Sequence, residues 1–200
     1  MLDPDLVIQL SISGDEQAFT TLVKEWYSRI YNFSLRYFND HDMAMEVTQK
    51  TFISAHKNIS KLENYKSFRS WLYRIASNYC HEQDRRSKRS KVFSLFSHKK
   101  NDELVDMVDI KTYHANQYET EKTFRKEEIT TMLKKAMAQI PEDQRVILIM
   151  KEYEGFKFRE IAEALQLSEN TVKSRMYYGL RALKKVLDKW NVNQEIYYEL

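Results

Sequence analysis

Glycine, proline and cysteine are scarce in this sequence, and each shortage excludes something. The 200 residues include 3 Gly and 2 Pro, which excludes a turn-rich all-β fold and favours long helices. Cys80 is the single cysteine, so the chain has no internal disulfide and suits a reducing cytosol. No run near the N-terminus has the apolar length of a signal peptide or a membrane-spanning helix. The expected location is therefore cytoplasmic, without membrane insertion.

The sequence also lacks the motifs on which most enzymes depend. It contains no phosphate-binding loop and no Cys/His spacing of a metal site. The 5 histidines have no evident nucleophile partner. We therefore expect no enzymatic activity, no metal or other cofactor, and no small-molecule substrate.

Apolar residues recur at helical spacing along most of the chain, which predicts an all-α fold of two small helical domains. Residues 1–91 are the expected N-terminal domain, and residues 124–190 the expected C-terminal domain. Residues 92–123 lack periodicity and include the acidic stretch 102–106, so they are interpreted as a linker. Residues 191–200 form a tail without an assigned role.

The C-terminal domain contains the pattern of a helix-turn-helix. Phe158, Ile161 and Leu165 share one helical face, and Ser168 is a good N-cap for a second helix. The apolar series of this second helix is Val172, Met176, Leu180, Leu183 and Leu187. In a helix-turn-helix the second helix enters the DNA major groove.

The opposite face of the second helix carries side chains that suit DNA. Asn can bond adenine, Lys and Arg meet guanine or phosphate, and Tyr and Ser meet phosphate or base edges. A solvated face of a helical bundle shows the same pattern, but this face carries no acidic residue between Asn170 and Arg181. The candidate DNA-binding residues are Asn170, Thr171, Lys173, Ser174, Arg175, Tyr177, Tyr178 and Arg181.

A second basic surface lies on the helix that begins near Trp71. Arg74, Asn78 and Arg85 share one face, and Arg86 extends the charge. Basic charge attracts phosphates, and the interleaved aromatic residues could stack on unpaired bases or simply form the core. Two such surfaces suggest a protein that holds DNA at two places.

With both surfaces placed, the chain resembles the extracytoplasmic-function (ECF) sigma factors over nearly its whole length. The resemblance rests on four motifs in order: Gly14-Asp15 with Ala18-Phe19, AMEVTQKTF at 44–52, FRSWLYRIASNYCHEQDRR at 68–86, and Ile140-Pro141 followed by the helix-turn-helix. Gln166 departs from the pattern, because this turn position is often Gly in the family.

The resemblance implies a factor that directs core RNA polymerase to promoters and helps to open them. The N-terminal domain would contact polymerase through Glu46, Gln49, Lys50 and Ile53, which are spaced i, i+3, i+4 and i+7 on one helix. It would bind the downstream (minus ten) element, with Glu63 and Asn64 as candidates for base contact and Arg74, Asn78, Arg85 and Arg86 for the strand. The C-terminal domain would read the upstream (minus thirty-five) element, and an anti-sigma factor would be a further partner.

Two other classes of protein remain open at this point. A stand-alone helix-turn-helix regulator explains the C-terminal domain but leaves the basic aromatic helix without a role. A helical adaptor without any nucleic-acid partner would show no salt-dependent binding to DNA.

Overall fold

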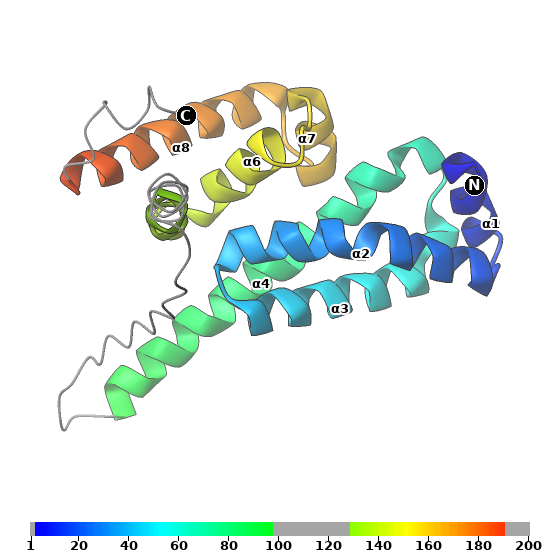
Figure 1. Cartoon of the computed structure of the whole chain (residues 1–200), viewed down its shortest axis with the longest axis horizontal. Helices are drawn as coiled ribbons and strands as arrows, with labels where there is room; N and C mark the ends of the chain where they lie inside the picture. Colours follow the sequence, from blue (N-terminus) through cyan, green and yellow to red (C-terminus); the bar gives the residue numbers. More distant parts are fainter. Residues whose placement is uncertain (1–2, 98–128, 191–200) are drawn as a thin grey trace, which may run out of the picture.

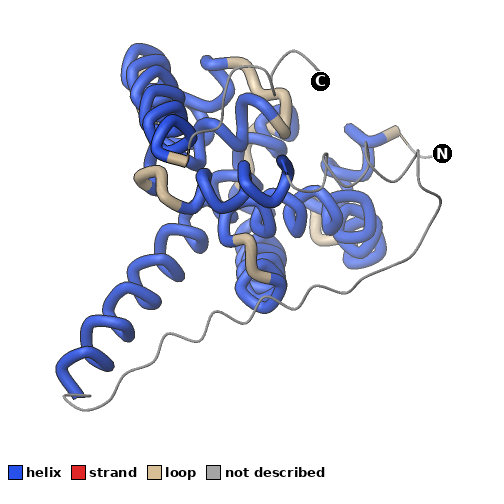
Figure 2. The backbone as a smooth tube through the Cα atoms, turned by 60° about the vertical axis from the view of Figure 1, so that its left-hand side comes forward, coloured by secondary structure: helices blue, strands red, loops and turns tan. Residues whose placement is uncertain are grey.

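The computed structural model describes residues 3–97 and 129–190, and every regular element in these two ranges is helical (Figure 2). The N-terminal part comprises α1 (Pro4–Ile12), α2 (Glu16–Phe38), α3 (His41–Asn58) and α4 (Phe68–Ser97), with the short 3₁₀ turns η1 (Ile59–Lys61) and η2 (Tyr65–Ser67) before α4. The C-terminal part comprises a helix over residues 129–138, then α6 (Glu142–Glu152), α7 (Phe158–Leu165) and α8 (Glu169–Lys189). The predicted all-α fold is confirmed.

Side-chain caps separate the first three helices. The Asp15 carboxylate accepts hydrogen bonds from the backbone N–H groups of Gln17 and Ala18 at 2.8 and 3.0 Å. Asn39 ends α2 in the left-handed conformation, and Asp40 begins α3 by accepting from the backbone of Met43 at 2.9 Å. These caps satisfy donors that a helix N-terminus leaves unpaired, which is why the chain turns at these two breaks.

The core of the N-terminal part lies between α2, α3 and α4; Figure 1 shows α2 and α3 side by side, with α4 crossing them at an angle. The inner face of α2 follows helical spacing, and Ile30 and Phe33 on it are fully buried. The Phe33 ring meets the Tyr73 ring of α4 edge-on, with centroids 5.2 Å apart. This packing holds α4 with one side in the core and the other available for contacts.

The helix α4 is longer than the sequence indicates. It continues to Ser97, so residues 92–97 are helical although the sequence analysis assigned them to the linker. The rest of that range, including the acidic stretch 102–106, lies outside the described residues, as does the tail 191–200.

The helix α6 is buried on all sides over the six consecutive residues Arg145–Met150. It packs against α8 of its own domain and also against α2 of the other domain. A helix buried all round must lie inside a core rather than on its surface. The two domains are therefore docked against each other, and their buried residues form one continuous cluster.

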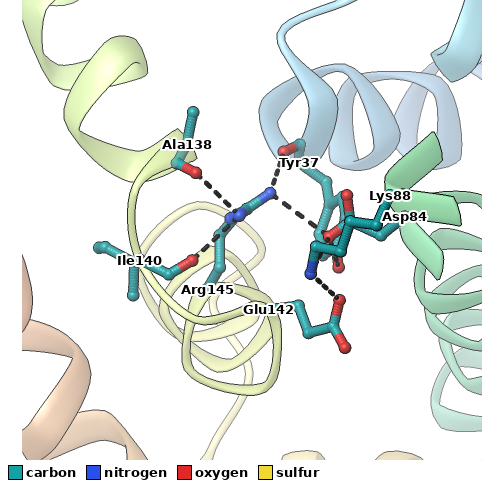
Figure 3. A network of polar contacts seen from close by, with 7 residues as sticks. All are labelled: Tyr37, Asp84, Lys88, Ala138, Ile140, Glu142 and Arg145. Atoms are coloured by element: carbon teal, nitrogen blue, oxygen red, sulfur yellow. Dashed lines mark hydrogen bonds and ion pairs between the residues drawn. The ribbon is translucent and has the colours of Figure 1, made fainter. Parts of the chain in front are cut away.

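Arg145 is the polar centre of this domain contact (Figure 3). Its guanidinium donates to the backbone carbonyls of Tyr37, Ala138 and Ile140 at 3.0 to 3.1 Å, and it lies 4.9 Å from the centre of the Tyr37 ring. The Asp84 carboxylate is 4.0 Å away. A buried cation needs such acceptors, and they come from both domains.

Candidate nucleic-acid and partner surfaces

The helix-turn-helix has the geometry that the sequence predicts. Gln166 links α7 to the turn in the left-handed conformation, with φ 55° and ψ 45°. The Ser168 hydroxyl then caps α8 by accepting from the backbone N–H of Thr171 at 3.0 Å. Val172 and Met176 pack inward, so the opposite face of α8 is turned outward.

Most of the predicted DNA-binding side chains lie on this outward face. Asn170, Lys173, Ser174, Tyr177, Tyr178 and Arg181 are exposed, and the two tyrosines are 63% and 54% accessible. Exposed aromatic side chains of this size are unusual on a solvated helix, because burial of their rings is favourable. This exposure favours a partner surface over a merely solvated face.

The other two predicted residues are partly engaged within the domain. The Thr171 hydroxyl lies 2.8 Å from the Ser168 hydroxyl, which places it in the helix cap. The Arg175 guanidinium forms an ion pair with Asp143 of α6 at 3.3 Å. Lys173 forms an ion pair with Glu169, one turn earlier, at 2.7 Å, on an exposed surface where such pairs are weak, and its ammonium lies 6.0 Å from the centre of the Phe158 ring.

On α4, the predicted basic surface divides into a free part and an engaged part. Asn78, Arg85 and Arg86 are exposed, and Arg86 pairs with Glu82 one turn earlier. Arg74 instead turns toward α7, where it donates to the backbone carbonyls of Glu163 and Ala164 at 3.0 and 3.1 Å. The structure therefore brings Arg74 to the helix-turn-helix rather than leaving it in the exposed stripe.

The segment between α3 and α4 is ordered by its own backbone contacts. The Asn64 side chain accepts from the backbone N–H of Lys66 at 3.0 Å and thereby caps η2. Glu63 and Asn64 are both exposed. Their candidate role in base contact is compatible with this position and stays a prediction.

A groove of about 590 Å³ lies between α2 and α3. Gln49 and Ile53 line it, and Ile53 is 49% exposed although it is fully apolar. Its other lining residues are Phe19, Val23, Tyr27, Met45, Phe52, His56 and Lys57. An exposed apolar groove of this kind is typical of a protein-binding surface.

The four residues predicted to contact polymerase do not form one free face. Glu46 accepts from Lys50 at 2.5 Å and from Gln83 of α4 at 2.9 Å, so it bridges two helices instead of lining the groove. The hydrogen bond from Lys50 lowers the pKa of the Glu46 carboxyl. The α2 side of the groove was not predicted from the sequence, where its only signal is that Phe19, Val23 and Tyr27 follow one another at i, i+4 and i+8.

No helix within residues 3–97 and 129–190 combines the length and apolarity that crossing a membrane requires. In the same residues, no three His, Cys, Asp or Glu side chains are grouped closely enough to hold a metal ion.

Comparisons with known proteins agree with this arrangement. Residues 22–90 match the family model of sigma-70 region 2, and residues 130–183 match that of sigma-70 region 4. The RNA polymerase sigma-H factor of Pseudomonas aeruginosa is 29% identical over 180 residues, which are 87% of this chain and 88% of the relative. The ECF RNA polymerase sigma factor SigW of Bacillus subtilis is 27% identical over 177 residues, 87% of this chain and 91% of the relative.

Two solved structures share the fold. The sigma factor RpoE of Bartonella quintana, crystallised with the anti-sigma factor NepR, has a TM-score of 0.60 at 20% identity and covers 85% of this chain and 96% of its own. CnrH, solved with the cytosolic domain of CnrY, has a TM-score of 0.62 at 18% identity and covers 94% of this chain and 99% of its own. The region 2 match falls on α2–α4, and the region 4 match runs from residue 130 through α6 and α7 into α8, so that it includes the helix-turn-helix. Because both regions are present and relatives match along nearly their whole length, the chain belongs to the ECF sigma factors of RNA polymerase.

Proposed function

We propose that this chain binds core RNA polymerase and directs it to promoters that contain two recognised elements. The proposal rests on one observation: the same chain contains a region 2 domain and a region 4 domain with a helix-turn-helix. A protein that reads two separate elements needs two DNA surfaces, and α4 and α8 supply them. The chain would act in the cytoplasm as a binding factor without catalysis of its own.

The upstream element would be read by the outward face of α8. Residues near the N-terminus of a recognition helix reach base edges, so Asn170, Lys173 and Ser174 are the proposed specificity residues. Tyr177 and Tyr178 follow one turn later and are exposed enough to reach bases or phosphates. Arg181 lies further along the helix and would contact phosphate.

The downstream element would be bound by α4 and the segment before it. Asn78, Arg85 and Arg86 are exposed cationic or polar groups along one helix, which suits the backbone of a separated strand. Glu63 and Asn64 lie at the N-terminal end of this surface and are proposed to contact an unstacked base. Arg74 would join them once it leaves the carbonyls of α7.

The groove between α2 and α3 is the proposed polymerase contact. Ile53 and Gln49 combine an exposed apolar side chain with an exposed amide, the mixture from which protein interfaces are built. Glu46 and Lys50 would act at its edge, where Lys50 donates to Glu46 and Glu46 accepts from Gln83 of α4. An anti-sigma factor is a further proposed partner, since the sigma factor RpoE, which shares this fold, was solved in complex with an anti-sigma factor.

A comparison of DNA binding with and without core polymerase tests this function. The free chain and the chain mixed with core polymerase are each incubated with a library of duplex promoter fragments at two salt concentrations. We expect sequence-specific retention only in the mixture. Tight specific binding by the free chain, unchanged by core polymerase, would identify a stand-alone regulator. No salt-dependent binding in either sample would identify an adaptor without a nucleic-acid role.

A further inference from the structure

Phe158 is the first residue of α7 and lies where three helices of the C-terminal domain meet. Its side chain is half-buried and packs against the core. The ammonium of Lys151, in the last turn of α6, lies 5.2 Å from the centre of the Phe158 ring, and that of Lys173 on α8 lies 6.0 Å from it. An aromatic face attracts cations within about 6 Å of its centre, so this ring is a platform for two lysines.

The backbone on both sides of α7 fixes the position of this ring. The backbone N–H of Lys157 donates to the carboxylate three residues later at 2.7 Å, directly before Phe158. At the other end of α7, Gln166 turns the chain in the left-handed conformation, and the Ser168 hydroxyl caps the start of α8. The ring is therefore held at a set place beside the second turn of α8, where Lys173 lies.

The Lys173 side chain is held by two groups of different chemistry. Glu169, one turn earlier, pairs with its ammonium at 2.7 Å, and the Phe158 ring provides the second contact. The Lys173 side chain is still 52% exposed, so it remains available to DNA. Ordering a flexible lysine for one contact costs rotamer entropy, and a side chain that is already oriented before binding loses less of it.

The orientation of this ammonium decides whether it reads sequence. An ammonium is a point charge that can meet any phosphate nearby, whereas base readout requires the donor to lie at one base edge. Lys173 is close to the N-terminus of the second helix of the helix-turn-helix, from which side chains reach bases. A group that orients Lys173 therefore favours base contact over phosphate contact.

We propose that Phe158 is a positioning residue for recognition of the upstream element: its ring, together with the Glu169 carboxylate, orients the Lys173 ammonium toward one base edge. DNA would replace Glu169 as the partner of the ammonium, while the contact with the ring persists in the complex. Phe158 itself would touch no base. This inference rests on the proposed function, because it needs an upstream element that Lys173 reads.

The first measurement is made by NMR on the free full-length chain with isotope-labelled lysine. A methylene group over an aromatic ring resonates upfield of the same group in a lysine that has no ring beside it. We expect the Lys173 signal, identified by its loss in Lys173→Arg, to be displaced upfield in the parent and in Phe158→Tyr. In Phe158→Leu it should return to the position of the other exposed lysines. A Lys173 signal that already has this position in the parent overturns the proposal.

The second measurement is promoter-library selection with core polymerase, at the base pair whose preference is lost in Lys173→Ala. Phe158→Leu should reduce the preference at this pair about two- to fivefold, as expected for a cation–π contact at an exposed site, and leave the other pairs unchanged. Phe158→Tyr keeps the aromatic face and should keep the parental preference. Leu165→Val is the matched control, because it shortens another half-buried side chain of α7. It should not change the preference.

A double variant separates orientation of Lys173 from packing of the ring. In the Lys173→Ala background, Phe158→Leu should have no further effect at this base pair, because no ammonium is left to orient. Circular dichroism verifies that each variant is folded. Phe158→Met, which is longer than leucine but has no ring, replaces Phe158→Leu if the leucine variant is unfolded.

Unchanged preference in the folded variant without the ring overturns the proposal, and so does an equal loss of preference with and without the Lys173 ammonium. Failure of the proposed function gives a different result. If the parent shows no sequence-specific binding with core polymerase, the function is refuted and the role of Phe158 in recognition with it. The NMR signal of Lys173 still decides the ring contact on its own.

Discussion

At the scale of single residues, Gln166 shows how the helix-turn-helix tolerates an unfavourable backbone. It adopts φ 55°, where residues with a side chain are strained and glycine is not. We predict that Gln166→Gly raises the free energy of unfolding by about 0.5–1 kcal/mol, because relief of strain outweighs the added freedom of the unfolded chain. Urea unfolding followed by circular dichroism measures it.

The control for this change is Lys184→Gly, at an exposed position within α8. There glycine replaces a residue in right-handed helix, so stability should fall by about 1 kcal/mol. A loss of stability in both variants would contradict the assignment of strain to Gln166.

The structure buries Gly179 instead of Leu180, which differs from the expectation based on the sequence. The apolar series placed Leu180 in the core, but Leu180 is 48% exposed and Gly179 is buried instead. A Cβ atom at Gly179 would lie 3.0 Å from Leu148 Cδ1 and 3.3 Å from Gln144 Cβ, both on α6. The close approach of α6 and α8 selects the glycine, and a hydrophobicity pattern cannot detect that because glycine carries no apolar side chain.

The correction predicts opposite effects at neighbouring positions. Gly179→Val should lower the free energy of unfolding by about 1–3 kcal/mol through overpacking against α6. Leu180→Val should change it by less than about 0.5 kcal/mol, because the side chain is half exposed. Thermal unfolding of the two variants measures this difference, and a larger loss for Leu180→Val would restore the original interpretation.

At the scale of helices, the sequence predicted the faces of α8 better than those of α4. The cap at Ser168 and the inward positions Val172 and Met176 are local features, so helical periodicity fixes which side chains point outward. Arg74 was placed in an exposed stripe by the same reasoning. Its partners are carbonyls 89 and 90 residues later in the chain, and periodicity within one helix contains no information about them.

The division of roles along α8 is testable by promoter-library selection. Lys173→Ala should relax the preference at one upstream base pair at a cost of about 1–3 kcal/mol, whereas Arg181→Ala should weaken all sequences alike. Both residues are exposed, so neither change removes a buried contact. Unchanged upstream preference in Lys173→Ala, or a base-specific change in Arg181→Ala, would contradict the proposed roles.

At the scale of the whole molecule, the docking of the domains is the feature that the sequence could not supply. Composition and spacing gave two helical domains, but the contact depends on Arg145, Glu154 and Phe156 finding partners in the other domain. Neither Glu154 nor Arg145 stands out in the sequence by its spacing or its residue type. Such residues can be identified as interface residues only once the path of the chain in space is known.

This contact also carries a titratable group. His81 is half-buried on α4 with its ring 6.1 Å from the Tyr37 ring, and burial lowers its pKa from the ordinary value of 6.5. Glu142, Asp84 and Asp143 favour the proton, while Arg85 opposes it as burial does. The folded protein disfavours protonated His81. The stability that neutral His81 contributes is therefore present above the ordinary pKa of 6.5 and is lost as the pH falls through the lowered pKa of the folded state.

We therefore predict a melting temperature that falls on acidification from about pH 7.5 to about pH 5.5, with a smaller fall in His81→Gln. The glutamine cannot be protonated in this range, so it removes the His81 share of the pH dependence. Scanning calorimetry of both proteins at several pH values measures the two slopes. Identical slopes would show that protonation of His81 does not destabilise the folded protein.

The central claim, that this chain is a promoter-directing subunit of RNA polymerase, is tested most directly by transcription in vitro. Core polymerase is supplied with a promoter-fragment library and with the parent chain, Ile53→Glu in the groove, or Leu10→Glu on α1 as an exposed apolar control. We expect discrete transcripts from a subset of fragments with the parent and with Leu10→Glu, and strongly reduced transcripts with Ile53→Glu. The same transcripts with and without the parent chain would contradict the claim.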